Sequence, residues 1–146
     1  MNYKINIEDI DFNRLMTNRD DFTRISKMME KGIHTDLNTS KEYFTGYSYN
    51  TLYDWDQYFE SIVQLHLGWD SKYIKNGVTI FLDNQCEDGF IMRRIHGTKE
   101  EEQKNNGTID NLTLQTMAKE DKEMVKPFLS QISLLIYKHE KDLSWI

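Results

Sequence analysis

The segment YDWDQYF, residues 53–59, places aromatic rings beside carboxylates and an amide. A flat aromatic side chain can cover the C–H face of a pyranose, and a carboxylate can accept two strong hydrogen bonds from neighbouring hydroxyls. Trp55 and Tyr53 are the candidate stacking residues, and Asp56 is the candidate hydroxyl acceptor. The segment therefore has the chemistry of a sugar-binding surface.

A structural role is the competing interpretation of the same residues. Between residues 50 and 68 apolar side chains recur at helical spacing, which predicts an amphipathic helix with a buried apolar side; they are Leu52, Trp55, Phe59, Ile62, Val63 and Leu67. On this interpretation Trp55 and Phe59 belong to the core, and Asp56 caps or pairs locally. Taken by themselves, the residues favour this second interpretation.

Asp54 and Asp56 suggest a catalytic pair of carboxylates, but their spacing argues against it. Inverting glycosidases hold two carboxyls roughly 6.5–9.5 Å apart on either side of the scissile bond. Side chains two residues apart on a helix point in different directions, so these two cannot flank one bond. No catalytic residue is assigned.

Composition excludes several other classes of function. The 18 basic and 24 acidic residues give a net charge of −6, which disfavours nucleic acid as a partner because phosphate binding needs a basic face. Cys86 is the only cysteine, and the four histidines lack metal-ligand spacing, so no metal or other cofactor is expected. No apolar run is long enough to span a membrane, and the first residues lack a signal-peptide pattern, so a cytoplasmic location is expected.

The elements that position these residues are predicted to be helices. Gly32 to Asn50 has no sustained period and is expected to be ordered but irregular. The long polar stretch that starts at Gly89-Phe90-Ile91 and is rich in charge and amide from Thr98 to Asn111 is expected to be a loop or a pair of short strands. Two consecutive helices joined by a very short connection should form an antiparallel αα-hairpin. The predicted helices span residues 7–31, 50–68, 70–89 and 124–139, the last with Pro127 in its first turn.

Three short motifs in this order resemble a known family. YDWDQYF looks like the Y-x-W-D-x-Y-[WF] core of the trehalase signature, and QCEDGFI, residues 85–91, looks like the Q-x-x-D-G-[FM]-I turn of related α-glycosidases. KPFL, residues 126–129, resembles the Pro-containing start of that group's next inward helix. Residues 45–49 lack the arginine of the full signature, and residues 92–94 read MRR instead of Pro-Asn-Gly. The resemblance therefore implies a trehalase-like glycosidase of unspecified sugar preference.

The resemblance implies a fold and a set of site residues. The fold would be all-α, with stacked antiparallel helical hairpins forming part of an (α/α)6 toroid. Residues 1–146 would be one helical domain, the N-terminal section of an inverting α-glycosidase, and therefore incomplete. The implied partner is a carbohydrate, an α-glucoside or related sugar. The implied substrate-binding residues are Tyr53, Trp55 and Asp56. Arg93, Arg94 and Gln131 are second-rank candidates.

Two consequences follow from the fragment interpretation. The catalytic acid and base would lie in later hairpins, so this chain alone is expected to be inactive. A helix without its next neighbour would leave an apolar edge and favour self-association; the expected edge contains Leu135, Ile136, Leu143, Trp145 and Ile146. The alternatives are a standalone helical protein-interaction module and a non-catalytic sugar-binding module.

Overall fold

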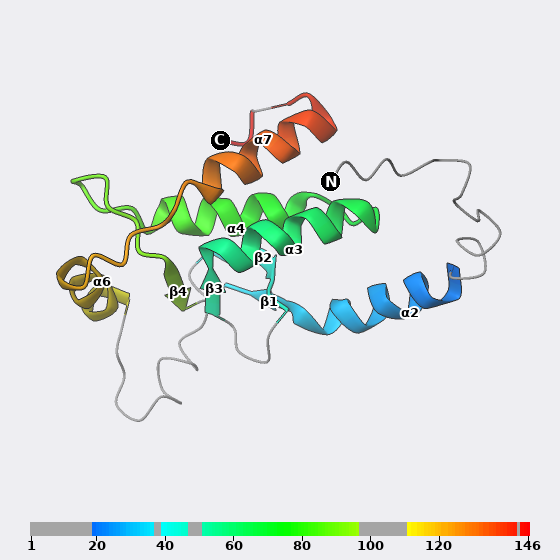
Figure 1. Cartoon of the computed structure of the whole chain (residues 1–146), viewed down its shortest axis with the longest axis horizontal. Coiled ribbons are helices and arrows are strands. Elements are labelled where there is room, and N and C mark those ends of the chain that lie inside the picture. Colours follow the sequence, from blue (N-terminus) through cyan, green and yellow to red (C-terminus); the bar gives the residue numbers. More distant parts are fainter. Residues whose placement is uncertain (1–18, 37–38, 47–50, 97–110, 143) are drawn as a thin grey trace, which may run out of the picture. The chain divides into compact units, whose positions relative to one another are not determined.

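The computed structural model describes residues 19–36, 39–46, 51–96, 111–142 and 144–146 (Figure 1). The chain divides into two compact units, Met1–Lys31 and Gly32–Ile146, which are described separately. In the first unit, helix α2 spans Arg19–Met29, within the helix predicted for residues 7–31. The start of that prediction lies outside the described residues. A 3-10 turn, η2 at Glu30–Gly32, follows α2.

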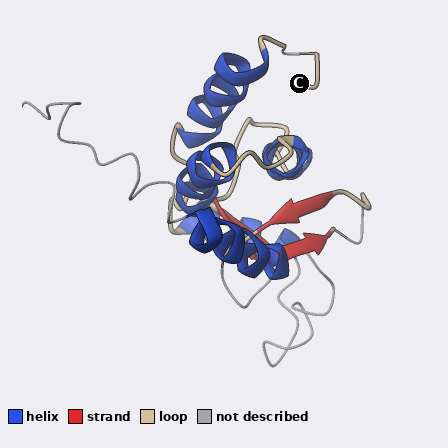
Figure 2. Cartoon of the chain, turned by 90° about the vertical axis from the view of Figure 1, so that its right-hand side faces the viewer, coloured by secondary structure: helices blue, strands red, loops and turns tan. Residues whose placement is uncertain are grey.

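The second unit contains strands as well as helices, so the prediction of an all-α toroid of stacked hairpins is wrong. Strand β1 (Ile33–Thr35) pairs antiparallel with β2 (Glu42–Phe44), with Ile33 opposite Phe44. Strand β3 (Thr51–Tyr53) pairs antiparallel with β4 (Arg94–His96), with Tyr53 opposite Arg94. The strands are red in Figure 2. Each is three residues long, too short for an alternating pattern to be visible in the sequence.

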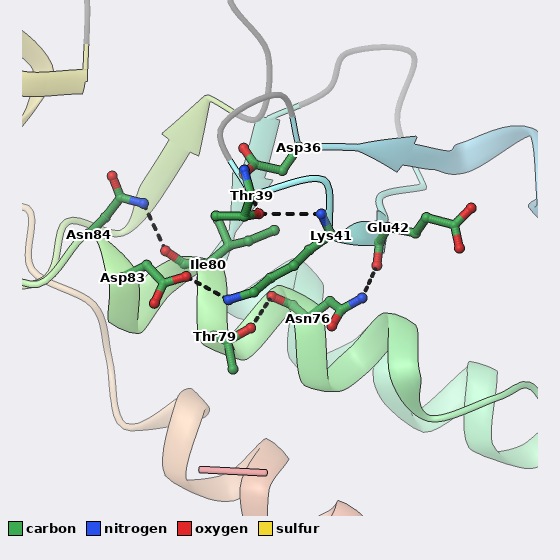
Figure 3. A network of polar contacts seen from close by, with 9 residues as sticks. All are labelled: Asp36, Thr39, Lys41, Glu42, Asn76, Thr79, Ile80, Asp83 and Asn84. Atoms are coloured by element: carbon green, nitrogen blue, oxygen red, sulfur yellow. Dashed lines mark hydrogen bonds and ion pairs between the residues drawn. The ribbon is translucent and has the colours of Figure 1, made fainter.

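Polar contacts fasten the β1–β2 hairpin to helix α4, which spans Lys72–Asp83 (Figure 3). The side-chain amide of Asn76 donates to the backbone oxygen of Glu42 at 2.7 Å, and Lys41 Nζ lies 2.7 Å from Asp83 Oδ2. Within the hairpin, Asp36 accepts the backbone N–H of Thr39 at 2.8 Å. Residues 32–50 were expected to be ordered but irregular. The described part is held in place by these contacts and by the buried ring of Tyr43, but it also contains the regular pairing of β1 with β2.

The predicted αα-hairpin is present and consists of α3 (Asp54–His66) followed by α4. The two helices run in opposite directions (Figure 1), and the connection between them includes Gly68, whose φ of +72° suits glycine. Gly77 of α4 lies directly against the Gln57 side chain of α3. A Cβ atom at Gly77 would come within 2.8 Å of that amide. A side chain larger than hydrogen at position 77 would therefore require the Gln57 amide to shift.

Helix α3 buries its polar side and exposes much of its apolar side. Four polar residues at helical spacing are buried: Asp54, Gln57, Ser61 and Gln64. On the other side Trp55, Phe59 and Val63 are 45%, 58% and 45% exposed. The structural interpretation of the apolar spacing, which placed Trp55 and Phe59 in the core, is therefore wrong. The surrounding elements supply the apolar core, so α3 contributes amides and a carboxylate to the interior instead.

Two further helices complete the second unit. Helix α6 (Asn111–Glu120) was not predicted, because its sequence is largely polar. Helix α7 spans Phe128–Glu140 and starts later than predicted, since residues before Pro127 are extended. There Met124 forms an antiparallel bridge with Met92, and the Val125 N–H donates to the Ile91 oxygen at 2.8 Å. Pro127 therefore precedes the helix and does not lie in its first turn.

The expected apolar edge at the C-terminal end is only partly present. Ile136 is fully buried and belongs to the core, and Trp145 packs against that core. Ile146 is 64% exposed, whereas Leu143 lies outside the described residues. The prediction was wrong for Ile136, because α7 directs this side chain toward the core. The core residues are Tyr43, Leu52, Ile74, Val78, Ile80, Phe81, Ile91, Met92, Ile95, Ala118, Leu129, Ile132 and Ile136.

Candidate functional site

Three chain segments meet where helix α3 begins: residues 51–54, 91–96 and 123–126. We call this meeting point the three-segment junction. The first two are joined by the β3–β4 pairing and by the Asp54 N–H, which donates to the Arg93 oxygen at 3.0 Å. The second and third are joined by the Arg93 N–H, which donates to the Glu123 oxygen at 3.2 Å. Backbone hydrogen bonds therefore fix the positions of the side chains that leave the junction.

Trp55 leaves the junction toward solvent, and its ring lies close to the ammonium of Lys126. The Lys126 Nζ atom lies 5.5 Å from the Trp55 ring centroid, within range of a cation–π interaction. The neighbouring rings form a second group, in which Tyr58 stacks on Phe128 at 5.3 Å between centroids and Phe59 lies 6.5 Å from Phe128. We call Trp55, Tyr58, Phe59 and Phe128 the aromatic surface.

Asp56 lies partly buried beside this surface. Burial is the largest influence on its pKa and raises it, and the nearby charge of Asp54 raises it further. A hydrogen bond from the Trp55 side chain and the positive charge of Arg93 act in the opposite direction. Asp56, Trp55 and Arg93 are therefore close enough to influence one another. Together they offer an aromatic face, an acceptor and a cation to a ligand.

Glu60, one helical turn after Asp56, was not selected from the sequence. Burial raises its pKa to about 7, the N–H of Gly46 lowers it, and the charge of Asp56 raises it. The Glu60 Oε1 atom accepts this N–H at 2.6 Å. The spacing of two carboxylates four residues apart was visible in the sequence and could have indicated their coupling. The burial that dominates the pKa of Glu60 was not visible.

The structure brings together three of the predicted site residues, Trp55, Asp56 and Arg93, and places Tyr53 next to them along the chain. Tyr53 is half-buried in β3 at the three-segment junction, and Trp55, Asp56 and Arg93 are gathered around the start of α3. Gln131 is exposed on α7, three residues after Phe128, so it lies on the same side of that helix as the aromatic surface. Lys126 was not predicted to contact Trp55, because its sequence motif, KPFL, indicates only the start of a helix.

The two carboxylates of the YDWD segment have separate environments. Asp54 is 1% exposed and its Oδ2 atom accepts the Lys126 N–H at 2.8 Å, whereas Asp56 remains partly open to solvent. A hollow of about 670 Å³ lies elsewhere, lined by residues 83–88 together with Gln115 and Lys119. Among the described residues, no three His, Cys, Asp or Glu side chains are grouped to hold a metal ion.

No protein-family model, curated protein or solved structure matches the chain. In the part of the chain that the structure describes, no helix combines the length and apolar character needed to cross a membrane.

Proposed function

We propose that the surface around Trp55 binds a sugar, an α-glucoside or a related saccharide, as the substrate-binding part of a trehalase-like inverting α-glycosidase. The observation that carries the proposal is the exposure of Trp55, 45%, beside Asp56 and Arg93. The catalytic acid and base are not among the residues assigned here. We further propose a cytoplasmic location, in keeping with a chain whose single cysteine allows no intrachain disulfide.

The chemistry of the three side chains supports this proposal. Trp55 is on the side of α3 opposite the buried polar residues, so its ring is not needed to fill the core. An exposed indole offers a flat apolar face to the C–H groups of a pyranose. Asp56 can accept hydrogen bonds from hydroxyls, and the Arg93 guanidinium can donate several. A sugar is the ligand class that uses all three.

A second function is favoured by a different observation on the same helix. Trp55, Phe59 and Val63 are exposed at intervals of four residues and form a continuous apolar stripe on α3. Such stripes also occur where a protein binds a partner helix. The protein-interaction alternative therefore requires the whole stripe, whereas sugar binding requires only its Trp55 end with Asp56 and Arg93.

Titration with maltose, trehalose and methyl α-glucoside, followed by NMR chemical shifts and by calorimetry, tests the proposal. The Trp55→Ala and Asp56→Ala variants should each weaken binding at least tenfold. Val63→Ala is the matched control, because it removes an exposed apolar side chain from the same stripe without touching the Trp55 end. The proposal fails if the wild-type chain binds none of the sugars, or if Val63→Ala weakens binding as much as Trp55→Ala.

A further inference from the structure

Asp54 is the most buried charged side chain among the described residues, and it is bonded to two other segments. It is 1% exposed, in the first turn of α3. Its backbone N–H donates to the Arg93 oxygen at 3.0 Å, and its Oδ2 atom accepts the Lys126 N–H at 2.8 Å. One residue therefore connects all three segments of the three-segment junction.

The segments that Asp54 connects carry the two cations of the candidate site. Arg93 influences the pKa of Asp56, and the Lys126 ammonium lies over the Trp55 ring. Both cations lie at the ends of long side chains, so the region that each can reach is set by where its backbone is held. We propose that Asp54 is a positioning residue: its carboxylate holds the backbone of Lys126, and its own backbone N–H holds that of Arg93, in register with Trp55. Its effect on sugar binding rests on the proposed function, but its effect on the Trp55 environment does not.

A purely structural role is the alternative for Asp54. Lys126 precedes Pro127 and helix α7, so a carboxylate at this place also lies near the positive end of the α7 dipole. Loss of Asp54 would then lower stability without altering the surroundings of Trp55. The two roles differ in one measurable quantity, which is the local charge at the Trp55 ring in a protein that is still folded.

Fluorescence quenching measures this charge directly. Trp55, Trp69 and Trp145 are the three tryptophans, so a Trp69→Phe, Trp145→Phe background leaves Trp55 as the single emitter. Iodide is attracted by a nearby ammonium, whereas acrylamide is neutral. The ratio of iodide to acrylamide quenching therefore reports whether Lys126 stays over the ring. Lys126→Met in the same background gives the ratio without the ammonium.

The test compares variants of Asp54 with a matched buried aspartate. Asp36 is 4% exposed and also accepts a backbone N–H, that of Thr39, in the β1–β2 hairpin. Asp54→Ala loses the carboxylate that binds the Lys126 N–H but keeps the backbone N–H that binds Arg93. It should therefore lower the quenching ratio toward the Lys126→Met value and weaken sugar binding less than Trp55→Ala does. Asp54→Asn keeps a hydrogen-bond acceptor at the same place, so it should retain most of the wild-type quenching ratio and most of the wild-type sugar affinity. Asp36→Ala should leave both unchanged, at a temperature where circular dichroism shows each variant folded.

The outcomes separate the two proposals. An unchanged quenching ratio in folded Asp54→Ala, or an equal change in Asp36→Ala, overturns the positioning role. If Asp54→Ala does not fold, Asp54→Ser decides by the same criterion, because its shorter side chain cannot take the place of the carboxylate. A changed ratio in a protein that binds no sugar supports the positioning role and rejects the proposed function.

Discussion

The carboxylate of Glu60 accepts the backbone N–H of Gly46 at 2.6 Å and so joins helix α3 to the chain that leaves strand β2. Gly46 fits closely against this carboxylate, because a Cβ atom there would lie 2.7 Å from Oε1. The partly buried position raises the pKa of Glu60 to about 7. A group with this pKa changes its charge within the physiological range, whereas an ordinary glutamate is fully ionised there.

The first prediction concerns the pH dependence of stability. Because the folded pKa of Glu60 is above the unfolded value of 4.5, its contribution is fully present below pH 4.5 and is lost as the pH rises through about 7. Glu60→Gln cannot ionise and should be more stable than the wild type at pH 8, by about 1–3 kcal/mol, with little difference at pH 4.5. Urea denaturation at the two pH values measures this.

The control for this prediction is Glu87→Gln, which alters an exposed glutamate in the turn after α4. It should change stability little at either pH. If Glu60→Gln and the wild type differ by the same amount at pH 4.5 and pH 8, the carboxyl of Glu60 does not titrate as described.

The second prediction concerns the buried amides of α3. Gln64 is fully buried, and neither the nitrogen nor the oxygen of its side-chain amide has a hydrogen-bond partner among the described residues. Methionine has a similar length and no strong polar group, so Gln64→Met should raise the free energy of unfolding by about 1–2 kcal/mol. Gln131→Met, on the exposed side of α7, is the control and should have little effect. A loss of stability in Gln64→Met would mean that the amide is hydrogen-bonded in solution, for example through buried water.

The third prediction concerns Gly32, the residue before strand β1. A Cβ atom at this position would lie 2.4 Å from the Thr45 backbone oxygen and 2.7 Å from Cε2 of the Phe44 ring. Phe44 is 2% exposed and has little room to move. Gly32→Ala should therefore lower stability by about 1–3 kcal/mol, measured by thermal unfolding. The adjacent exposed residue offers a control, and Lys31→Ala should unfold at nearly the wild-type temperature.

The fourth prediction concerns the aromatic surface. Phe59 is 58% exposed and its ring meets Tyr58 and Phe128 at centroid distances of 5.3 and 6.5 Å. Phe59→Ser should cost little stability, about 1 kcal/mol or less, because most of the ring is already in water. It should also reduce the binding of a dye that reports exposed apolar surface. Large destabilisation with unchanged dye binding would show that Phe59 is covered in solution.

The helical parts of the fold were predictable because their signals are local. The α3–α4 hairpin follows from two periodic apolar segments on either side of Gly68, and the structure confirms it. Strands β1 to β3 were not predicted, because a three-residue strand depends on a partner that is distant along the chain. Strand β4 lies in the stretch after Gly89 for which a loop or a pair of short strands was expected, whereas residues 97–110 of that stretch lie outside the described residues. The apolar spacing of α3 also predicted the wrong side of this helix to face inward. Gln57 and Gln64 are buried by neighbouring elements, and the periodicity of α3 itself carries no information about those elements.

The candidate site likewise combines residues that the sequence indicated with residues that only the fold brings into it. Tyr53, Trp55 and Asp56 were selected as neighbours in sequence, and Arg93 was selected through a motif; the structure places them together. Lys126 and Glu60 required tertiary information. The position of Lys126 depends on the hydrogen bond between its N–H and the Asp54 carboxylate, 72 residues earlier, which no local pattern reveals.

The pairing of β3 with β4 has a consequence for the order of folding. These strands lie on either side of the α3–α4 hairpin along the chain, so their hydrogen bonds close a loop that contains both helices. Closing a long loop costs conformational entropy before the contacts between its two ends have formed. A helical hairpin, in contrast, forms contacts between residues that are close along the chain. We therefore expect α3 and α4 to associate early and Arg93 to arrive beside Trp55 late. By the same reasoning, mild denaturant should expose the backbone amides of β4 to hydrogen exchange before those of α4. Arg93 would then move away from Trp55 while the helix that carries Trp55 is still folded.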